Sequence, residues 1–311
     1  MQLHLVLVSF VASVSAISLV NSVLALTCIQ YYGNYNFGCK LPMNMTCVCR
    51  NDLWIALVMD CVLTHNTSRG ERNHAVWHTR RRCYDRSNHQ VKLVQLDMER
   101  IWHDNPASPD VPSDAKATLT KPFHAQGEKF DFAYNSYKSL KRNTDNSDML
   151  GWGFIYYWAL MVVVGGIFHR VLGPKRVPMF WKQLQRKLLP LLIFREVTLD
   201  MWLISSVFFI YVVLATALGY GVVIRPNIYI ADNELLTLDL IGYRSGILSF
   251  ALLPLVFFFG IRNNPFAILS GWLYPQFSFF HKYLAVLMAT EAMIHSGVWT
   301  GYAMKSGGYE Q

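Results

Sequence analysis

The chain has 311 residues, of which 53% are hydrophobic, with a formal net charge of +8 and a mean hydropathy of +0.23. Long uncharged runs in the second half exclude a soluble globular protein and predict an integral membrane protein. The positive charge does not indicate nucleic-acid binding, because basic residues gather in the cytoplasmic loops of membrane proteins. We therefore expect membrane lipid, and no nucleic acid, among the partners.

Residues 1–25 are predicted to form a secretory signal peptide. An apolar core runs from Leu3 to Val20, and Val23 and Ala25 supply small residues at positions −3 and −1 of a cleavage site after Ala25. No Lys or Arg precedes the apolar core, so an uncleaved membrane anchor is the alternative.

Residues 26–150 are predicted to form a small extracellular domain stabilised by disulfides. All six cysteines lie between Cys28 and Cys83, and an even set in this position indicates an oxidising compartment. Six cysteines allow 15 pairings. Cys47 and Cys49 are too close to bond each other easily, and a zinc site at that pair is the alternative. Sequons at Asn44 and Asn66 predict a glycoprotein.

Three other features of this domain are interpreted as structural. The run from Arg80 to Arg82 is interpreted as a solvated face, and the stretch "KRNTDNSDM" at residues 141–149 as a linker. The histidines are interpreted as surface imidazoles, with weak metal binding as the alternative; they are His65, His74, His78, His89, His103 and His124.

Four membrane-spanning helices are predicted next, at residues 152–168, 201–224, 241–260 and 279–302. Seven Lys and Arg residues between positions 170 and 195 place the first loop in the cytoplasm and the amino terminus outside. Residues 151–225 thus hold two helices and the basic loop, residues 240–303 two more helices, and residues 304–311 a tail. The predicted fold is an all-α transmembrane helical bundle of four spans with a small disulfide-bearing extracellular domain.

The last predicted helix carries ionisable residues, His281, Glu291 and His295. An α-helix turns about 100° and rises about 1.5 Å per residue, so the two histidines share a face to within about 40° and are separated by about 21 Å. Imidazole is an axial ligand of haem iron, and two haems stacked through the membrane would explain the spacing. Hydrogen bonding of isolated histidines to a neighbouring helix is the other interpretation.

The segments "RSGILSFALLPLVFFFGIRNNP" (244–265) and "FHKYLAVLMATEAMIH" (280–295) together resemble the fungal ferric reductase family, which is related to the NADPH oxidases. The resemblance covers about residues 240–302. It implies an oxidoreductase of the plasma membrane that passes electrons from NADPH through FAD and two haem b (heme b) groups to extracellular ferric or cupric chelates. It also implies a part in iron or copper uptake, with the high-affinity iron uptake machinery as a partner.

The resemblance also implies roles for individual residues. His281 would ligate the inner haem and His295 the outer one. Arg244 and Arg262 would pair with haem propionates, because guanidinium binds carboxylate through two hydrogen bonds; Arg262 as an ordinary cytoplasmic anchor is the alternative. Glu291 lies four residues before His295 and would either accept the imidazole N–H or, as a neutral acid, bond a neighbouring helix.

The sequence departs from the family beyond the histidine pair. No histidine comes after His295, and no G-x-G-x-x-G fingerprint follows a strand. The second histidine pair and the FAD and NADPH domains are therefore missing. We expect a fragment of a longer reductase; the alternative is a short, non-catalytic membrane partner or regulator of a full-length relative. Iron or copper, and plasma membrane or vacuole, are left open.

Overall fold

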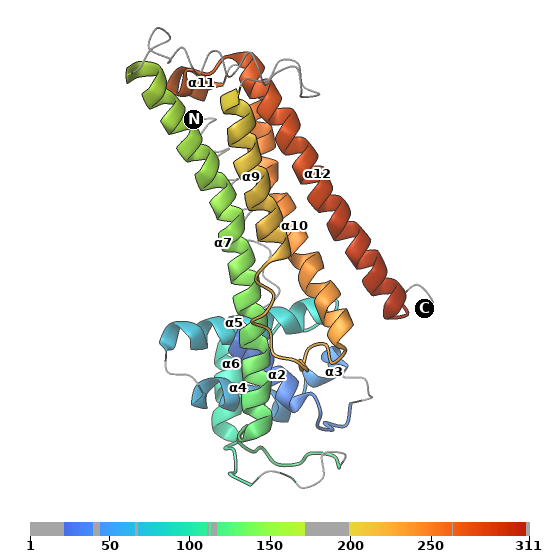
Figure 1. The fold of residues 1–311 in the computed structure, drawn as a ribbon. Helices are drawn as coiled ribbons and strands as arrows, with labels where there is room; N and C mark the ends of the chain where they lie inside the picture. Colours follow the sequence, from blue (N-terminus) through green and yellow to red (C-terminus); the bar gives the residue numbers. More distant parts are fainter. Residues whose placement is uncertain are drawn as a thin grey trace. The chain divides into compact units, whose positions relative to one another are not determined.

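The computed structural model describes residues 22–39, 44–65, 68–110, 112, 117–171, 199–262 and 264–308. These residues form α-helices and two isolated β-bridges, with no strand in the described ranges (Figure 1). They divide into two compact units. The amino-terminal unit comprises described residues from 22 to 142 together with 223–231, and the bundle unit comprises those from 143 to 222 and from 232 onward.

The amino-terminal unit begins with helices α2 (Val23–Tyr32), α3 (Met45–Val48), α4 (Asp52–Thr64), α5 (Arg69–Arg86) and α6 (Gln95–Asp104). The first four start where a side-chain oxygen accepts a free backbone N–H of the first turn; the capping residues are Ser22, Asn44, Asn51 and Ser68. Helix α4 is buried from Trp54 to Val62 and packs against α2, α5 and α6, so it forms the centre of this unit.

Three disulfides join these helices. Cys28 bonds Cys61, Cys39 bonds Cys47, and Cys49 bonds Cys83. Two of the bonds close long loops, with sequence separations of 33 and 34 residues. The predicted disulfide framework is confirmed. The alternative zinc site at Cys47 and Cys49 is wrong, because both sulfurs are consumed in bonds to other cysteines.

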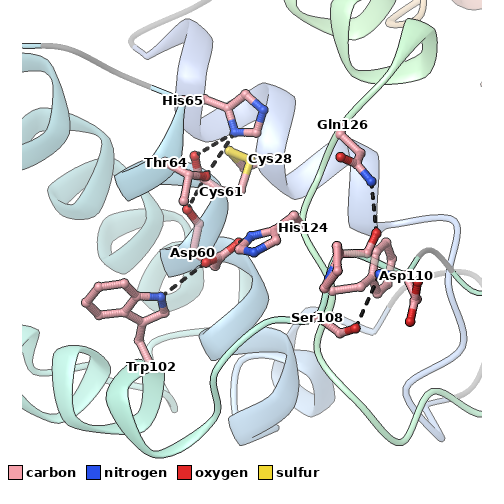
Figure 2. Close-up of polar contacts among 12 residues, drawn as sticks. Cys28, Asp60, Cys61, Thr64, His65, Trp102, Ser108, Asp110, His124 and Gln126 are labelled. Atoms are coloured by element: carbon pink, nitrogen blue, oxygen red, sulfur yellow. Dashed lines mark hydrogen bonds and ion pairs between the residues drawn. A yellow bond between two sulfur atoms is a disulfide. The ribbon is translucent and has the colours of Figure 1, made fainter.

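A buried carboxylate, Asp60, links α4 to two distant segments (Figure 2). Its Oδ2 lies 2.7 Å from Nδ1 of His124, and its Oδ1 accepts a hydrogen bond of 3.4 Å from the indole N–H of Trp102. His65 lies nearby, with its ring centroid 3.9 Å from that of Phe130. Two of the histidines interpreted as surface imidazoles therefore make specific contacts within the unit.

Helix α7 (Glu128–Val171) overturns the predicted linker at residues 141–149. The helix starts 24 residues before the expected first span and runs through this stretch without a break. Asn143 and Ser147 are 3% and 1% exposed, and the Ser147 hydroxyl donates to the Asn143 carbonyl at 2.8 Å. Asn143, Thr144 and Ser147 therefore form a buried face of the helix, although the composition of the stretch is typical of a solvated segment.

The bundle unit contains the rest of α7 with α9 (Leu199–Ala217), α10 (Asn233–Gly260), α11 (Pro265–Ser270) and α12 (Tyr274–Lys305). Two of the predicted helix boundaries are wrong. The second span was expected to reach Ile224, but α9 ends at Ala217 and Gly219 follows with a φ of +89°. The third predicted helix was expected to begin at residue 241, but α10 begins at Asn233 because Asp232 accepts two backbone N–H groups of its first turn.

Three of the described helices, α7, α9 and α10, are long and apolar enough to cross a membrane. Helix α12 forms where the fourth span was predicted, and its 32 residues exceed the about 20 residues that a crossing needs. Its ionisable residues make it too polar to join the other three by composition alone. Helices α10 and α12 make the most extensive helix pair, and their side-by-side packing positions the histidines (Figure 1).

Three other predictions fall wholly or partly on residues that the structure does not describe. Residues 1–21 of the predicted signal lie outside them, and the expected cleavage position after Ala25 lies within α2. The basic loop lies outside them after residue 171, and Arg170, in the last turn of α7, is exposed. The sequon residue Asn44 is exposed at the start of α3, whereas Asn66 lies outside the described residues.

Candidate functional site

His281 and His295 both project from α12 toward α10. Nδ1 of His281 lies 2.9 Å from the carbonyl oxygen of Val256, and Nδ1 of His295 lies 2.7 Å from that of Gly242. The histidines are 14 residues apart in sequence, and so are the two carbonyls. The common face expected from helical periodicity is therefore present, and the two rings make the same contact at two levels of one helix pair.

These hydrogen bonds determine the state of each ring. A backbone carbonyl only accepts, so Nδ1 must carry the proton, and the lone pair of the neutral ring is on Nε2. Within the described residues Nε2 of neither ring has a hydrogen-bond partner. Both side chains are half-buried.

This chemistry fits a haem iron. Metal-ligating histidines donate their other ring N–H to a carbonyl or carboxylate, which fixes the tautomer and the ring orientation. A haem could use one imidazole from this helix, because a histidine is a common protein ligand of haem iron. No three His, Cys, Asp or Glu side chains lie close enough to hold a metal ion in the part of the chain that the structure describes. His281 and His295 can each supply one axial nitrogen.

Arg244 lies inside α10, is 1% exposed and is surrounded by acceptors. Its Nε donates to Ser147 Oγ at 3.1 Å and its Nη2 to Asn143 Oδ1 at 3.0 Å, both on α7. Its Nη1 faces the backbone carbonyl of Ala215, in the last turn of α9, and that of Leu218, just after the helix. Its Nη2 also faces the carbonyl of Gly219. The guanidinium also lies 4.0 Å from the ring centroid of Tyr220.

These contacts engage all the donors of the guanidinium and join three helices. They give no support to the expectation that Arg244 pairs with a haem propionate, and they indicate a structural role instead. Arg262 is exposed just beyond the end of α10, a position compatible with either of its two interpretations.

Glu291 is 3% exposed and faces α9. Its Oε1 accepts a hydrogen bond of 2.6 Å from the hydroxyl of Thr216, whose own backbone carbonyl accepts the hydroxyl of Tyr220 at 2.6 Å. Oε2 is buried without a hydrogen-bond partner among the described residues. Of the two interpretations of Glu291, the geometry matches a buried acid that bonds a neighbouring helix rather than one that bonds His295.

Sequence reasoning missed Asn143, Ser147, Thr216 and Tyr220 as members of this buried polar cluster. The one indication of them in the sequence is their position in or beside apolar helices. A polar side chain in such a segment usually has a functional or packing role. Arg244 and Glu291, around which they gather, lie 24 or more residues away from them in sequence, so local pattern alone could not bring them together.

Comparisons with known proteins match most of the segment that forms this helix pair. Residues 245–311 match the family model described as "Ferric reductase like transmembrane component". Ferric/cupric reductase transmembrane component 2 of Saccharomyces cerevisiae is 38% identical over 96 residues, which are 30% of this chain and 14% of that protein. Ferric reductase transmembrane component 4 of the same yeast is 47% identical over 62 residues, 20% of this chain and 9% of that protein.

A longer but weaker match reaches the amino-terminal half. Ferric reductase transmembrane component 3 of Saccharomyces cerevisiae is 27% identical over 211 residues, which are 62% of this chain and 30% of that protein. The chain therefore aligns with less than a third of the length of these relatives. No solved structure matches the chain. The resemblance to the fungal ferric reductases is confirmed.

Proposed function

Since residues 245–311 match the ferric reductase-like transmembrane family, we propose that this chain forms part of a membrane oxidoreductase that reduces ferric or cupric chelates. The observation that carries the proposal is the pair of equivalent imidazoles on α12. Each has its Nδ1 hydrogen-bonded to α10 and its Nε2 available as a ligand.

In the proposed function His281 and His295 would each hold one haem b through Nε2. When bound, haem b accepts and donates single electrons, which lets charge cross a membrane that excludes ions. The helix rise places the two imidazoles about 21 Å apart along α12, within a hydrocarbon core of about 30 Å. The two ligands therefore span most of the distance that an electron must cross.

The other residues of the bundle unit hold the ligands in place. The hydrogen bonds that the ring Nδ1–H groups donate to the carbonyls of Val256 and Gly242 oppose rotation of each ring about its Cβ–Cγ bond. Arg244 ties α10 to α7 and to the end of α9, and Glu291 ties α12 to α9. Leu284 and Leu287, which lie between the two histidines on α12, are buried in the apolar cluster that α12 forms with α7, α9 and α10.

The finer parts of the proposal come from the family resemblance. Electrons would come from NADPH through FAD and leave to chelates on the outer side of the plasma membrane, in iron or copper uptake. The amino-terminal unit would lie outside the cell after removal of a signal peptide. Its three disulfides support this placement, because structural disulfides persist in oxidising compartments.

The test is cell-surface ferric-chelate reduction by the complete gene product in cells without other surface reductases. We expect His281→Ala and His295→Ala each to abolish reduction, because each interrupts electron transfer at one level. His65→Ala is the control and should keep full activity, since His65 lies in the amino-terminal unit. Normal activity of either α12 variant, at normal surface amount, would remove that histidine from the electron path.

A further inference from the structure

Two glycines of α10 lie directly against the two histidines of α12. A Cβ atom on Gly246 would lie 2.7 Å from Nδ1 and 2.8 Å from Cε1 of His295. A Cβ atom on Gly260 would lie 3.0 Å from Nδ1 and 3.2 Å from Cε1 of His281. Carbon and nitrogen atoms in contact prefer separations of about 3.5 Å or more, so any larger residue would push the ring away.

Each of the two glycines lies at the same distance along α10 from the carbonyl that accepts the ring N–H group. Gly246 follows Gly242 by four residues, and Gly260 follows Val256 by four residues. In an α-helix the N–H of a residue points at the carbonyl four residues earlier, so each glycine is one turn from its carbonyl on the same face. The imidazole can reach the second lone pair of that carbonyl only where the helix has no side chain.

The repetition distinguishes this arrangement from ordinary close packing of helices. The two glycines are 14 residues apart, as are the two carbonyls and the two histidines. Glycine inside a helix costs about 0.5–1 kcal/mol relative to alanine, so a helix interior does not favour it without a packing reason. By contrast, a Cβ atom on Gly297 of α12 would meet open space.

We propose that Gly246 and Gly260 are positioning residues, each of which holds one α12 imidazole in the orientation that presents Nε2 to iron. Each glycine and the carbonyl one turn before it form an imidazole cradle, and α10 carries two such cradles at the spacing of the histidines. This inference rests on the proposed function, in which His281 and His295 ligate haem. It assigns Gly260 to the inner haem and Gly246 to the outer haem.

The test is low-temperature electron paramagnetic resonance of the complete oxidised protein, in which each low-spin haem gives its own signal. The variants are Gly246→Ala and Gly260→Ala, with Gly297→Ala as the matched control that makes the same substitution in a helix where space is open. We expect Gly246→Ala to change only the signal that His295→Ala removes. We expect Gly260→Ala to change only the signal that His281→Ala removes.

The sizes of the two effects should differ. The closer contact at Gly246 predicts about tenfold weaker haem retention at the outer level, as for other losses of a residue that orients a metal ligand. The looser contact at Gly260 predicts a retained haem with a shifted signal. The control should leave both signals unchanged, and the persistence of one haem signal in each variant shows that the protein has folded.

Three results would overturn the proposal. The first is an unchanged pair of signals in both glycine variants, and the second is an equal disturbance of both signals by either variant, as general loosening of the bundle would give. The third applies to the unmodified protein and does not need a folded variant: electron–nuclear double resonance that finds no Nδ1 proton on the axial imidazoles. If the unmodified protein binds no haem at all, the proposed function itself fails.

Discussion

Arg244→Ala tests whether the buried guanidinium is structural. The substitution removes the donors that face Asn143 and Ser147 on α7 and three carbonyls after and at the end of α9. A hydrogen bond to a charged group contributes about 1.5–3 kcal/mol, and a buried acceptor left without a donor adds its own penalty. The two side-chain bonds alone, taken at the lower value, predict a loss of about 3 kcal/mol.

The assay is thermal unfolding of the complete protein in detergent, followed by loss of soluble monomer. Arg244→Ala should lower the midpoint strongly. The midpoint of Arg244→Lys should lie between those of Arg244→Ala and the unmodified protein. Lysine keeps the charge, but its single nitrogen cannot reach acceptors on two helices. Unchanged stability together with a shifted outer-haem potential would refute the structural role and restore the assignment of Arg244 to a propionate.

Three further predictions concern the amino-terminal unit and use urea unfolding of the complete protein followed by tryptophan fluorescence. Replacing Cys49 and Cys83 together by Ser should cost about 2–5 kcal/mol, because the disulfide closes a loop of 34 residues in the unfolded chain; an unchanged midpoint would contradict the pairing. Asp60→Asn should lower the free energy of unfolding by about 1.5–3 kcal/mol, because it weakens the bond to His124. An unchanged free energy of unfolding would show that this bond does not stabilise the unit. Burial lowers the pKa of His78 from 6.5 to about 4. The unfolded chain therefore binds the extra proton first, so stability should fall by about 2 kcal/mol as the pH drops from 6.5 to 4, with allowance for partial exposure; His78→Asn should remove this slope, and an unchanged slope would contradict it.

The features that the sequence predicted best are those set by local pattern. The face shared by His281 and His295 follows from 100° per residue and needs no tertiary information. The presence of disulfides follows from six cysteines within one polar segment. Their pairing does not, because it depends on how α2, α4 and α5 pack.

The errors arose where a distant partner decides the local structure. Residues 141–149 have the composition of a linker, yet they are helical because Asn143 and Ser147 face Arg244, about a hundred residues later. The sequence left two interpretations of Glu291 open, and its contact with Thr216 on another helix, which matches one of them, could not be seen from spacing alone. The role of Gly246 and Gly260 had no signal in either helix alone, since it becomes visible only when α10 and α12 are aligned.

The most direct test of the central claim is the dithionite-reduced minus oxidised absorption spectrum of membranes that carry the complete protein. The account predicts the bands of b-type haem, reduced in amplitude by His281→Ala or His295→Ala and absent when both are replaced. A membrane-inserted protein without b-type bands, or one whose bands survive the double replacement, would contradict it.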